Sequence, residues 1–221
     1  ARMNDFEANV TGSFFLVAAS MLWVGWTLLP AKLGDFLVAS DFAAVGARRR
    51  LWIWMFRIHL FGHVIAVMAF VALATLVAGS TARIVVWPAV AVVGTGLMMG
   101  AIAAAFYYHF GAWGSLDMEG KSDETVQGFV DSLRVTTEYV TCLVRFGRVF
   151  FGVGQMVLVV GLMLPQAGPW PLWLLGSGGL LGLAGMALTM GLPDDLRLYR
   201  PVFHLNALWL AAFGVVTLTL G

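Results

Sequence analysis

Long apolar stretches, each ended by charged residues or prolines, alternate along this chain with shorter polar connections. About 20 mostly apolar residues are enough to cross a hydrocarbon core of about 30 Å as a helix. Six stretches reach that length, at about residues 11–30, 51–78, 84–109, 135–164, 170–191 and 201–221. None shows the short alternation of polar and apolar positions that is typical of a transmembrane β-barrel. The pattern predicts an all-α, polytopic integral membrane protein, residues 1–221 forming a single domain.

A more polar stretch leads into the fourth apolar segment and has the pattern of an amphipathic helix. Ser122 is a suitable N-cap, and the two acidic residues that follow it suit the first turn of a helix. Val126 and Phe129 then fall on one face at helical spacing. We expect a helix over about residues 122–134 that lies on the cytoplasmic membrane surface. A second surface helix is expected over residues 41–50, with its three arginines at anionic lipid headgroups.

Composition supports this membrane assignment and excludes several other classes of protein. Apolar residues make up 60% of the chain and charged residues 11%, with a mean hydropathy of +0.87. A water-soluble domain usually has about a quarter of its residues charged. The net charge of +1 gives no indication of nucleic-acid binding, and one cysteine cannot form a disulfide scaffold.

Basic residues cluster on alternate connections, which predicts the orientation of the chain. Of the 13 lysines and arginines, only Arg2 and Arg83 lie on the side of the predicted termini. Both termini are therefore expected to face the periplasm or cell exterior, and the three longer connections the cytoplasm. This arrangement favours the cytoplasmic (inner) membrane of a bacterium.

Four histidines near the predicted cytoplasmic boundary give the main indication of function. His59 and His63 are four residues apart on the second predicted helix, His109 ends the third, and His204 begins the sixth. His59, His109 and His204 are expected at about one depth, and His63 about 6 Å deeper at 1.5 Å per residue. Polar side chains at such positions are costly in lipid and often functional.

A tetrapyrrole, either haem b or a (bacterio)chlorophyll, is one ligand that this pattern favours. Two histidines hold a b-type haem from opposite faces, so they must come from different helices. His59 with His109, or His59 with His204, meets the depth condition. The cations at the same edge that could meet haem propionates are Arg57, Arg145, Arg148 and Arg200.

The histidines are also compatible with a quinone, with a metal ion, or with no ligand at all. A quinone site needs a polar side chain and an apolar slot, and the candidates for that side chain are His63, Tyr107, Tyr139 and Gln155. His59 and His63 could together bind one metal ion, because residues at i and i+4 share a helix face. All four histidines could instead be ordinary interfacial or packing residues.

Small and uncharged polar residues inside the spans indicate helix packing. The pairs Gly96/Gly100 and Gly178/Gly182 let helices approach closely, within the chain, toward a second copy or toward other membrane subunits. Gln155 and Asn206 are each interpreted as forming a hydrogen bond to another helix. No Asp, Glu or Lys lies deep in a span, which disfavours coupled transport.

These patterns predict a membrane-embedded subunit of an electron-transfer or energy-converting complex that binds a tetrapyrrole or quinone near the cytoplasmic leaflet. Short connections leave little room for an independent enzyme, so catalysis by the chain alone is not expected. The alternatives are a structural or assembly subunit without cofactor, a channel or facilitator, and a histidine-ligated membrane metalloenzyme. The expected partners are the lipid bilayer and other membrane subunits, with no nucleic acid.

Overall fold

The structure is a computed structural model that describes residues 5–28, 37–192 and 196–220. Within these residues it is helical and contains no strand. Six helices are long and apolar enough to cross a membrane, which confirms the predicted fold class. They are α1 (Asp5–Leu28), α3 (Arg49–Leu76), α4 (Arg83–Phe106), α6 (Asp123–Leu162), α7 (Leu172–Gly191) and α8 (Leu196–Leu220).

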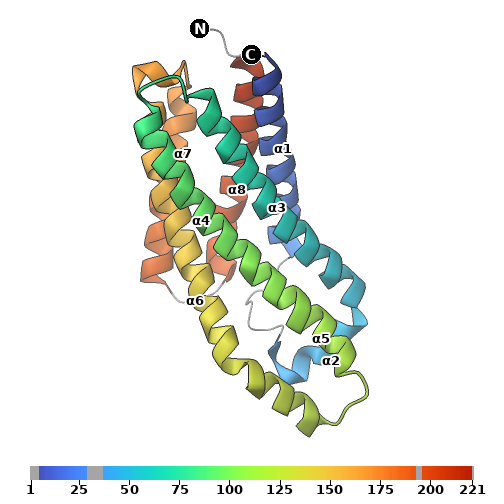
Figure 1. The fold of residues 1–221 in the computed structure, drawn as a ribbon. Coiled ribbons are helices and arrows are strands. Elements are labelled where there is room, and N and C mark those ends of the chain that lie inside the picture. The colour runs from blue at the N-terminus through green and yellow to red at the C-terminus, as the bar shows by residue number, and fades with distance from the viewer. Residues whose placement is uncertain (1–4, 29–36, 193–195, 221) are drawn as a thin grey trace.

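Shorter helical segments connect these six. They are η2 (Ala39–Asp41), α2 (Phe42–Ala47), the π-helix η3 (Tyr107–Trp113), α5 (Gly114–Asp117) and η4 (Pro165–Ala167). The start of α1 and the end of α8 lie at one end of the bundle, here named the terminal end (Figure 1). The opposite, extended end carries α2, α5 and the first turns of α6. Which side of a membrane each end faces stays a prediction from the distribution of basic residues.

The six long helices form a ring in which each helix packs against two neighbours. The order around the ring follows the chain, from α1 through α3, α4, α6 and α7 to α8, which returns to α1. The pairing of α7 with α8 is the most sparsely packed. This ring is what allows side chains from all six helices to reach a common interior.

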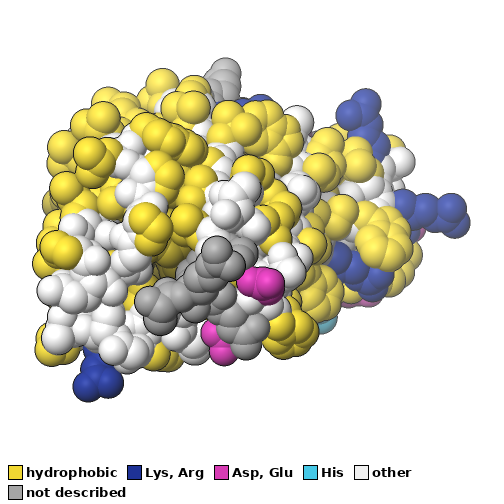
Figure 2. Space-filling model, turned by 90° about the horizontal axis from the view of Figure 1, so that it is seen from above, with side chains coloured by type: hydrophobic (Ala, Val, Ile, Leu, Met, Phe, Trp, Pro, Cys, Tyr) yellow, Lys and Arg dark blue, Asp and Glu magenta, His cyan; other side chains and the backbone are white. Residues whose placement is uncertain are grey.

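Large apolar side chains cover the outside of the ring, as contact with lipid requires. Exposed leucine, valine, methionine and tryptophan side chains occur among the long helices. Figure 2 shows this apolar surface, with lysine and arginine side chains gathered mainly toward one side of the view. Such a surface would be insoluble in water, so the fold supports contact with a bilayer.

Aromatic side chains fill the interior toward the terminal end. Phe15 meets Phe70 edge to face with ring centroids 5.2 Å apart, and Trp209 meets Phe213 at 4.8 Å. Phe70 also lies 6.3 Å from Trp209 across the ring. Aromatic pairs at these separations pack favourably and leave little space between the helices.

Glycines set the spacing between neighbouring helices. A Cβ added to Gly96 would lie 2.5 Å from the carbonyl oxygen of Gly147, and one added to Gly152 would lie 2.6 Å from that of Gly182. A Cβ at Gly178 would lie 2.6 Å from the Trp209 indole. The predicted glycine faces are therefore used for packing within the chain, so an association with another subunit through them would need these contacts to open.

The predicted surface helix and fourth span are one continuous helix, α6, of 40 residues. Ser122 caps it as expected, because its hydroxyl accepts a hydrogen bond from the Thr125 amide at 3.3 Å. At 1.5 Å per residue the helix is about 60 Å long, twice the hydrocarbon thickness. Phe129 packs on Phe42 of α2, with ring centroids 5.9 Å apart. The apolar face thus covers protein rather than lying flat on lipid, and the chain does not turn at residue 134.

Two further boundaries differ from the sequence prediction. The expected helix over residues 41–50 breaks at Arg48, so α2 ends at Ala47 and Arg49 begins the long helix α3. The third span does not end at residue 109 but continues through the π-helix η3 into α5. The apolar windows located the spans well, but polar residues at their ends are also helical.

The glycine contacts predict unequal effects of two alanine substitutions. Gly152→Ala must separate α6 from α7 because the new methyl group meets backbone, and it should lower the free energy of unfolding by about 1–3 kcal/mol. Gly176→Ala on α7 meets nothing within 4 Å and is the matched control. Its expected effect is neutral or slightly stabilising, since alanine favours helix. Unfolding in detergent measures both, and equal losses of stability would contradict the packing described.

Candidate functional site

A cavity of about 110 Å³ lies inside the ring, between the aromatic core and the extended end, and all six long helices line it. For comparison, a cavity of about 150 Å³ can hold one benzene molecule. Most of the lining is apolar. The polar or charged side chains that line it are His59, His63, Tyr107, Arg148, Gln155, Tyr199 and Asn206.

His63 presents one ring nitrogen as an acceptor. Its Nδ1 lies 2.8 Å from the backbone carbonyl oxygen of His59, a geometry in which the nitrogen donates its proton. In the neutral ring the lone pair is then on Nε2, as the hydrogen bond at the other nitrogen dictates. A Cβ on Gly100 would lie 2.5 Å from this Nε2, so glycine at position 100 makes room for the ring.

His59 packs beside His63 and against the backbone of α1. The two imidazole centroids are 4.5 Å apart at an interplanar angle of 66°, and the Trp26 ring is 6.1 Å away. Its buried Nδ1 has no hydrogen-bond partner among the described residues. A Cβ at Gly25 would lie 2.6 Å from that atom. A lone pair is easier to leave unpaired than an N–H, so this packing favours a proton on Nε2 of His59.

Gln155 of α6 and Asn206 of α8 connect two helices that both flank α7 in the ring. The amide Nε2 of Gln155 donates to Oδ1 of Asn206 at 3.0 Å, which confirms the interhelical bond predicted for these residues. Asn206 in turn donates to the Val202 carbonyl at 3.1 Å. The Gln155 side chain is fully buried, and its Oε1 accepts no hydrogen bond from the described residues. An unpaired buried acceptor costs about 1–3 kcal/mol unless a ligand or water donates to it.

Arg148 reaches the ring interior instead of extending toward the membrane surface. Its guanidinium carbon lies 4.3 Å from the centroid of the Tyr199 ring and 5.6 Å from that of Phe203. Phe203 stacks on Trp26, with centroids 5.0 Å apart. The faces of these rings stabilise the cation where lipid would not. Trp26, Phe203 and Tyr199 therefore form an aromatic wall, and the positively charged guanidinium of Arg148 lies against it.

Two of the predicted histidines lie outside the cavity. His109 is exposed on the π-helix η3, with its ring against Phe110 at 4.7 Å. His204 lies between α1 and α8, where Nε2 is 3.0 Å from the Thr27 hydroxyl and Nδ1 donates to the Arg200 carbonyl at 2.8 Å. The four imidazoles therefore do not meet at one point, although His59 and His63 do lie together.

The predicted arginines are similarly divided. Arg57 donates to the Tyr108 hydroxyl at 2.9 Å and lies over the Trp54 ring, away from the cavity. Arg145 is exposed. Of the four predicted arginines, including Arg200, Arg148 alone lines the cavity.

Several lining residues were not singled out from the sequence as site residues. Trp26 and Tyr199 are two of them: Tyr199 lies against Arg148 of α6, and Trp26 of α1 stacks on Phe203 of α8. Glycines were the one feature of the sequence that could have indicated this site, because Gly25 and Gly100 each lie directly against a histidine ring. Their partners are on other helices, so spacing along the chain could not reveal the match.

The geometry of the two cavity histidines does not fit a haem held between them. The rings of His59 and His63 are in contact on one helix, so no macrocycle can lie between them. The lone pair on Nε2 of His63 could still serve as a single axial ligand. Among the described residues no group of three or more His, Cys, Asp and Glu side chains is placed to hold a metal ion. His59 and His63 thus lack a third protein ligand in that part of the chain.

Comparison with known proteins adds no assignment to this geometry. No protein family, curated protein or solved structure matches the chain. The chemistry of the cavity therefore rests on its own donors, acceptors and shape.

The bond between Gln155 and Asn206 predicts a measurable coupling. In a double-mutant cycle, Gln155→Ala and Asn206→Ala should show an interaction free energy of about 1 kcal/mol, typical of interhelical hydrogen bonds in membranes. Gln155→Ala paired with Thr95→Ala is the control, because Thr95 bonds only within its own helix. Additive effects of Gln155→Ala and Asn206→Ala on unfolding in detergent would contradict the bond.

Proposed function

We propose that the protein is a membrane subunit that binds a hydroquinone with an apolar tail, a quinol, in the cavity among His59, His63 and Gln155. The observation that carries this proposal is the pair of acceptors left for a ligand. Oε1 of Gln155 has no donor among the described residues, and Nε2 of His63, beside Gly100, carries the lone pair of the neutral ring. Both belong to side chains that line the cavity of about 110 Å³.

Acceptors favour the reduced form of such a ligand. The hydroxyl groups of a hydroquinone donate hydrogen bonds, whereas the carbonyl groups of the oxidised quinone only accept them. Pairing a buried acceptor with a donor removes the cost of leaving it unpaired. At these two acceptors the quinol is expected to bind more tightly than the quinone, which would raise the reduction potential of the bound pair.

The histidine also gives the site a role in proton transfer. Oxidation of a quinol to a quinone releases two electrons and two protons. An imidazole nitrogen that accepts a hydrogen bond from the hydroxyl is positioned to take one of these protons. The electrons need an acceptor, which we assign to a partner subunit of an electron-transfer or energy-converting complex.

The distribution of charge supports an orientation of this subunit in a bacterial inner membrane. The arginines at the start of α3, together with Lys121, lie toward the extended end, whereas α4 begins with Arg83 at the terminal end. By the positive-inside rule the extended end would face the cytoplasm of a bacterial inner membrane. The cavity would then lie in the cytoplasmic half of the bilayer.

The proposal predicts that quinol affinity depends on His63. A short-tailed ubiquinol titrated into the purified protein should bind, and His63→Leu should weaken binding by about tenfold or more, because one charge-neutral hydrogen bond to the ligand is lost. His109→Leu is the matched control, since this histidine is exposed and outside the cavity. Isothermal calorimetry measures all three affinities.

Three results would contradict this function. One is equal binding of an alkylbenzene that has the same tail but no hydroxyl groups. Another is unchanged quinol affinity in His63→Leu. The third is a tetrapyrrole absorption band in the purified protein that disappears in His63→Leu, which would assign the same nitrogen to a haem or chlorophyll instead.

A further inference from the structure

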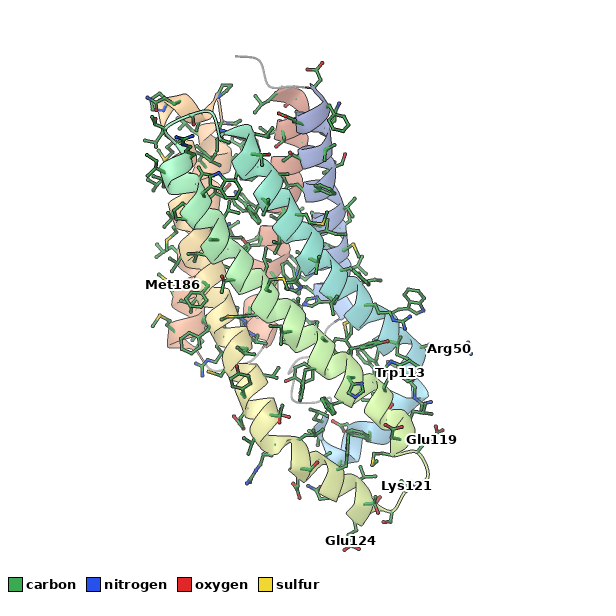
Figure 3. All side chains as sticks on the ribbon, in the orientation of Figure 1. Arg50, Trp113, Glu119, Lys121, Glu124 and Met186 are labelled. Atoms are coloured by element: carbon green, nitrogen blue, oxygen red, sulfur yellow. The ribbon has the colours of Figure 1, made fainter. Side chains whose placement is uncertain are left out.

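A second hollow lies at the extended end, where α3 begins. This cleft, of about 530 Å³, is bordered by Arg48, Arg49, Arg50, Ile53, Trp113 and Leu116, among others. None of the described residues that line it is acidic. Figure 3 shows Arg50 projecting outward from the start of α3 and Trp113 on the adjoining π-helical segment.

The three arginines do not have the same surroundings. Arg49 is anchored to the neighbouring segment, since it donates to the Glu119 carboxylate at 2.9 Å and to the Ser115 hydroxyl at 3.3 Å. This ion pair neutralises the charge of Arg49 and fixes one wall of the cleft. Arg48 and Arg50 are both exposed. Their two positive charges are therefore available to an anion from outside the chain.

The cleft also has an apolar side. Ile53 is buried beneath it, whereas Leu51 and Leu116 are 43% and 42% exposed at its edge. Trp113 adds an amphipathic ring of the kind that lies at membrane interfaces. A ligand that fits must combine negative charge with an apolar portion, and a free phosphate ion lacks the second feature.

From its position at the start of α3, we expect the cleft to lie at the depth of lipid headgroups. The helix has 28 residues and is thus about 42 Å long, whereas a bilayer measures about 30 Å across its hydrocarbon and about 40–45 Å with headgroups. If the apolar end of α3 at Leu76 reaches one boundary of the hydrocarbon, its first turn lies about 10 Å beyond the other. That is the level of the phosphate groups.

We propose that this cleft binds one anionic phospholipid, with its phosphate between Arg48 and Arg50 and its glycerol and upper acyl chain along Leu51 and Leu116. Arginine suits this role because its planar group donates to phosphate oxygens in pairs. The site is separate from the cavity, so this inference does not depend on the proposed quinol.

Native mass spectrometry of the full chain with dioleoyl phosphatidylglycerol tests the proposal. The wild-type chain should retain one lipid tightly. The double variant Arg48→Gln/Arg50→Gln should bind it about thirtyfold more weakly, since each basic residue near a membrane surface contributes about fivefold to affinity. The control is Lys121→Gln/Arg134→Gln, which removes equal charge at the same end outside the cleft and should bind as the wild type does.

Two competing ligands distinguish the source of the phosphate. Dioleoyl phosphatidylcholine, with no net charge, should bind the wild type at least tenfold more weakly, and millimolar inorganic phosphate should not displace phosphatidylglycerol. Circular dichroism verifies that both double variants remain helical. Equal loss in the two double variants, equal binding of the two lipids, or displacement by inorganic phosphate would each overturn the proposal.

Discussion

The central physical constraint on this protein is the absence of water in the hydrocarbon core of a bilayer. A polar side chain there must find a partner within the protein, because lipid offers none. The chain meets the constraint with few polar groups and directs several of them inward: His63 donates to a carbonyl of its own helix, and Gln155 of α6 bonds to Asn206 of α8. The acceptors still available after these bonds define the candidate site.

Close helix packing gives the cavity its dimensions. Gly96 and Gly152 bring α6 against α4 and α7, and glycines opposite the two cavity histidines admit the imidazole rings. Toward the terminal end the aromatic core fills the same ring. In the other half of the bundle, glycines and polar side chains occur among the large apolar side chains that line the cavity.

The fold was predictable from the sequence because crossing a bilayer requires a minimum apolar length, and that length can be counted. Interhelical bonding by Gln155 and Asn206 was predictable for a related reason, since an isolated amide in a span needs a partner. The continuity of α6 was not predictable in this way. Residues near 134 are polar, yet they are helical, and Phe129 packs on protein. Apolar length alone does not distinguish a surface helix that ends in a turn from one continuous long helix.

The candidate site was only partly predictable, and the histidines show why. Position along a helix gives depth, so the nearness of His59 to His63 could be anticipated. The direction of a side chain around the helix axis depends on which neighbours pack there and on irregular turns. His109 lies on a π-helix that no sequence pattern indicated, and His204 faces Thr27 across the α1–α8 contact. Shared depth was therefore insufficient to predict a shared site.

The decisive experiment is a structure of the protein determined in lipid nanodiscs with a short-tailed ubiquinol. We expect density for one ring inside the bundle, with a hydroxyl about 2.6–3.2 Å from Nε2 of His63 or from Oε1 of Gln155. Imidazole rings turned outward to lipid, or a cavity occupied by acyl chain while the quinol binds elsewhere, would contradict the proposed site.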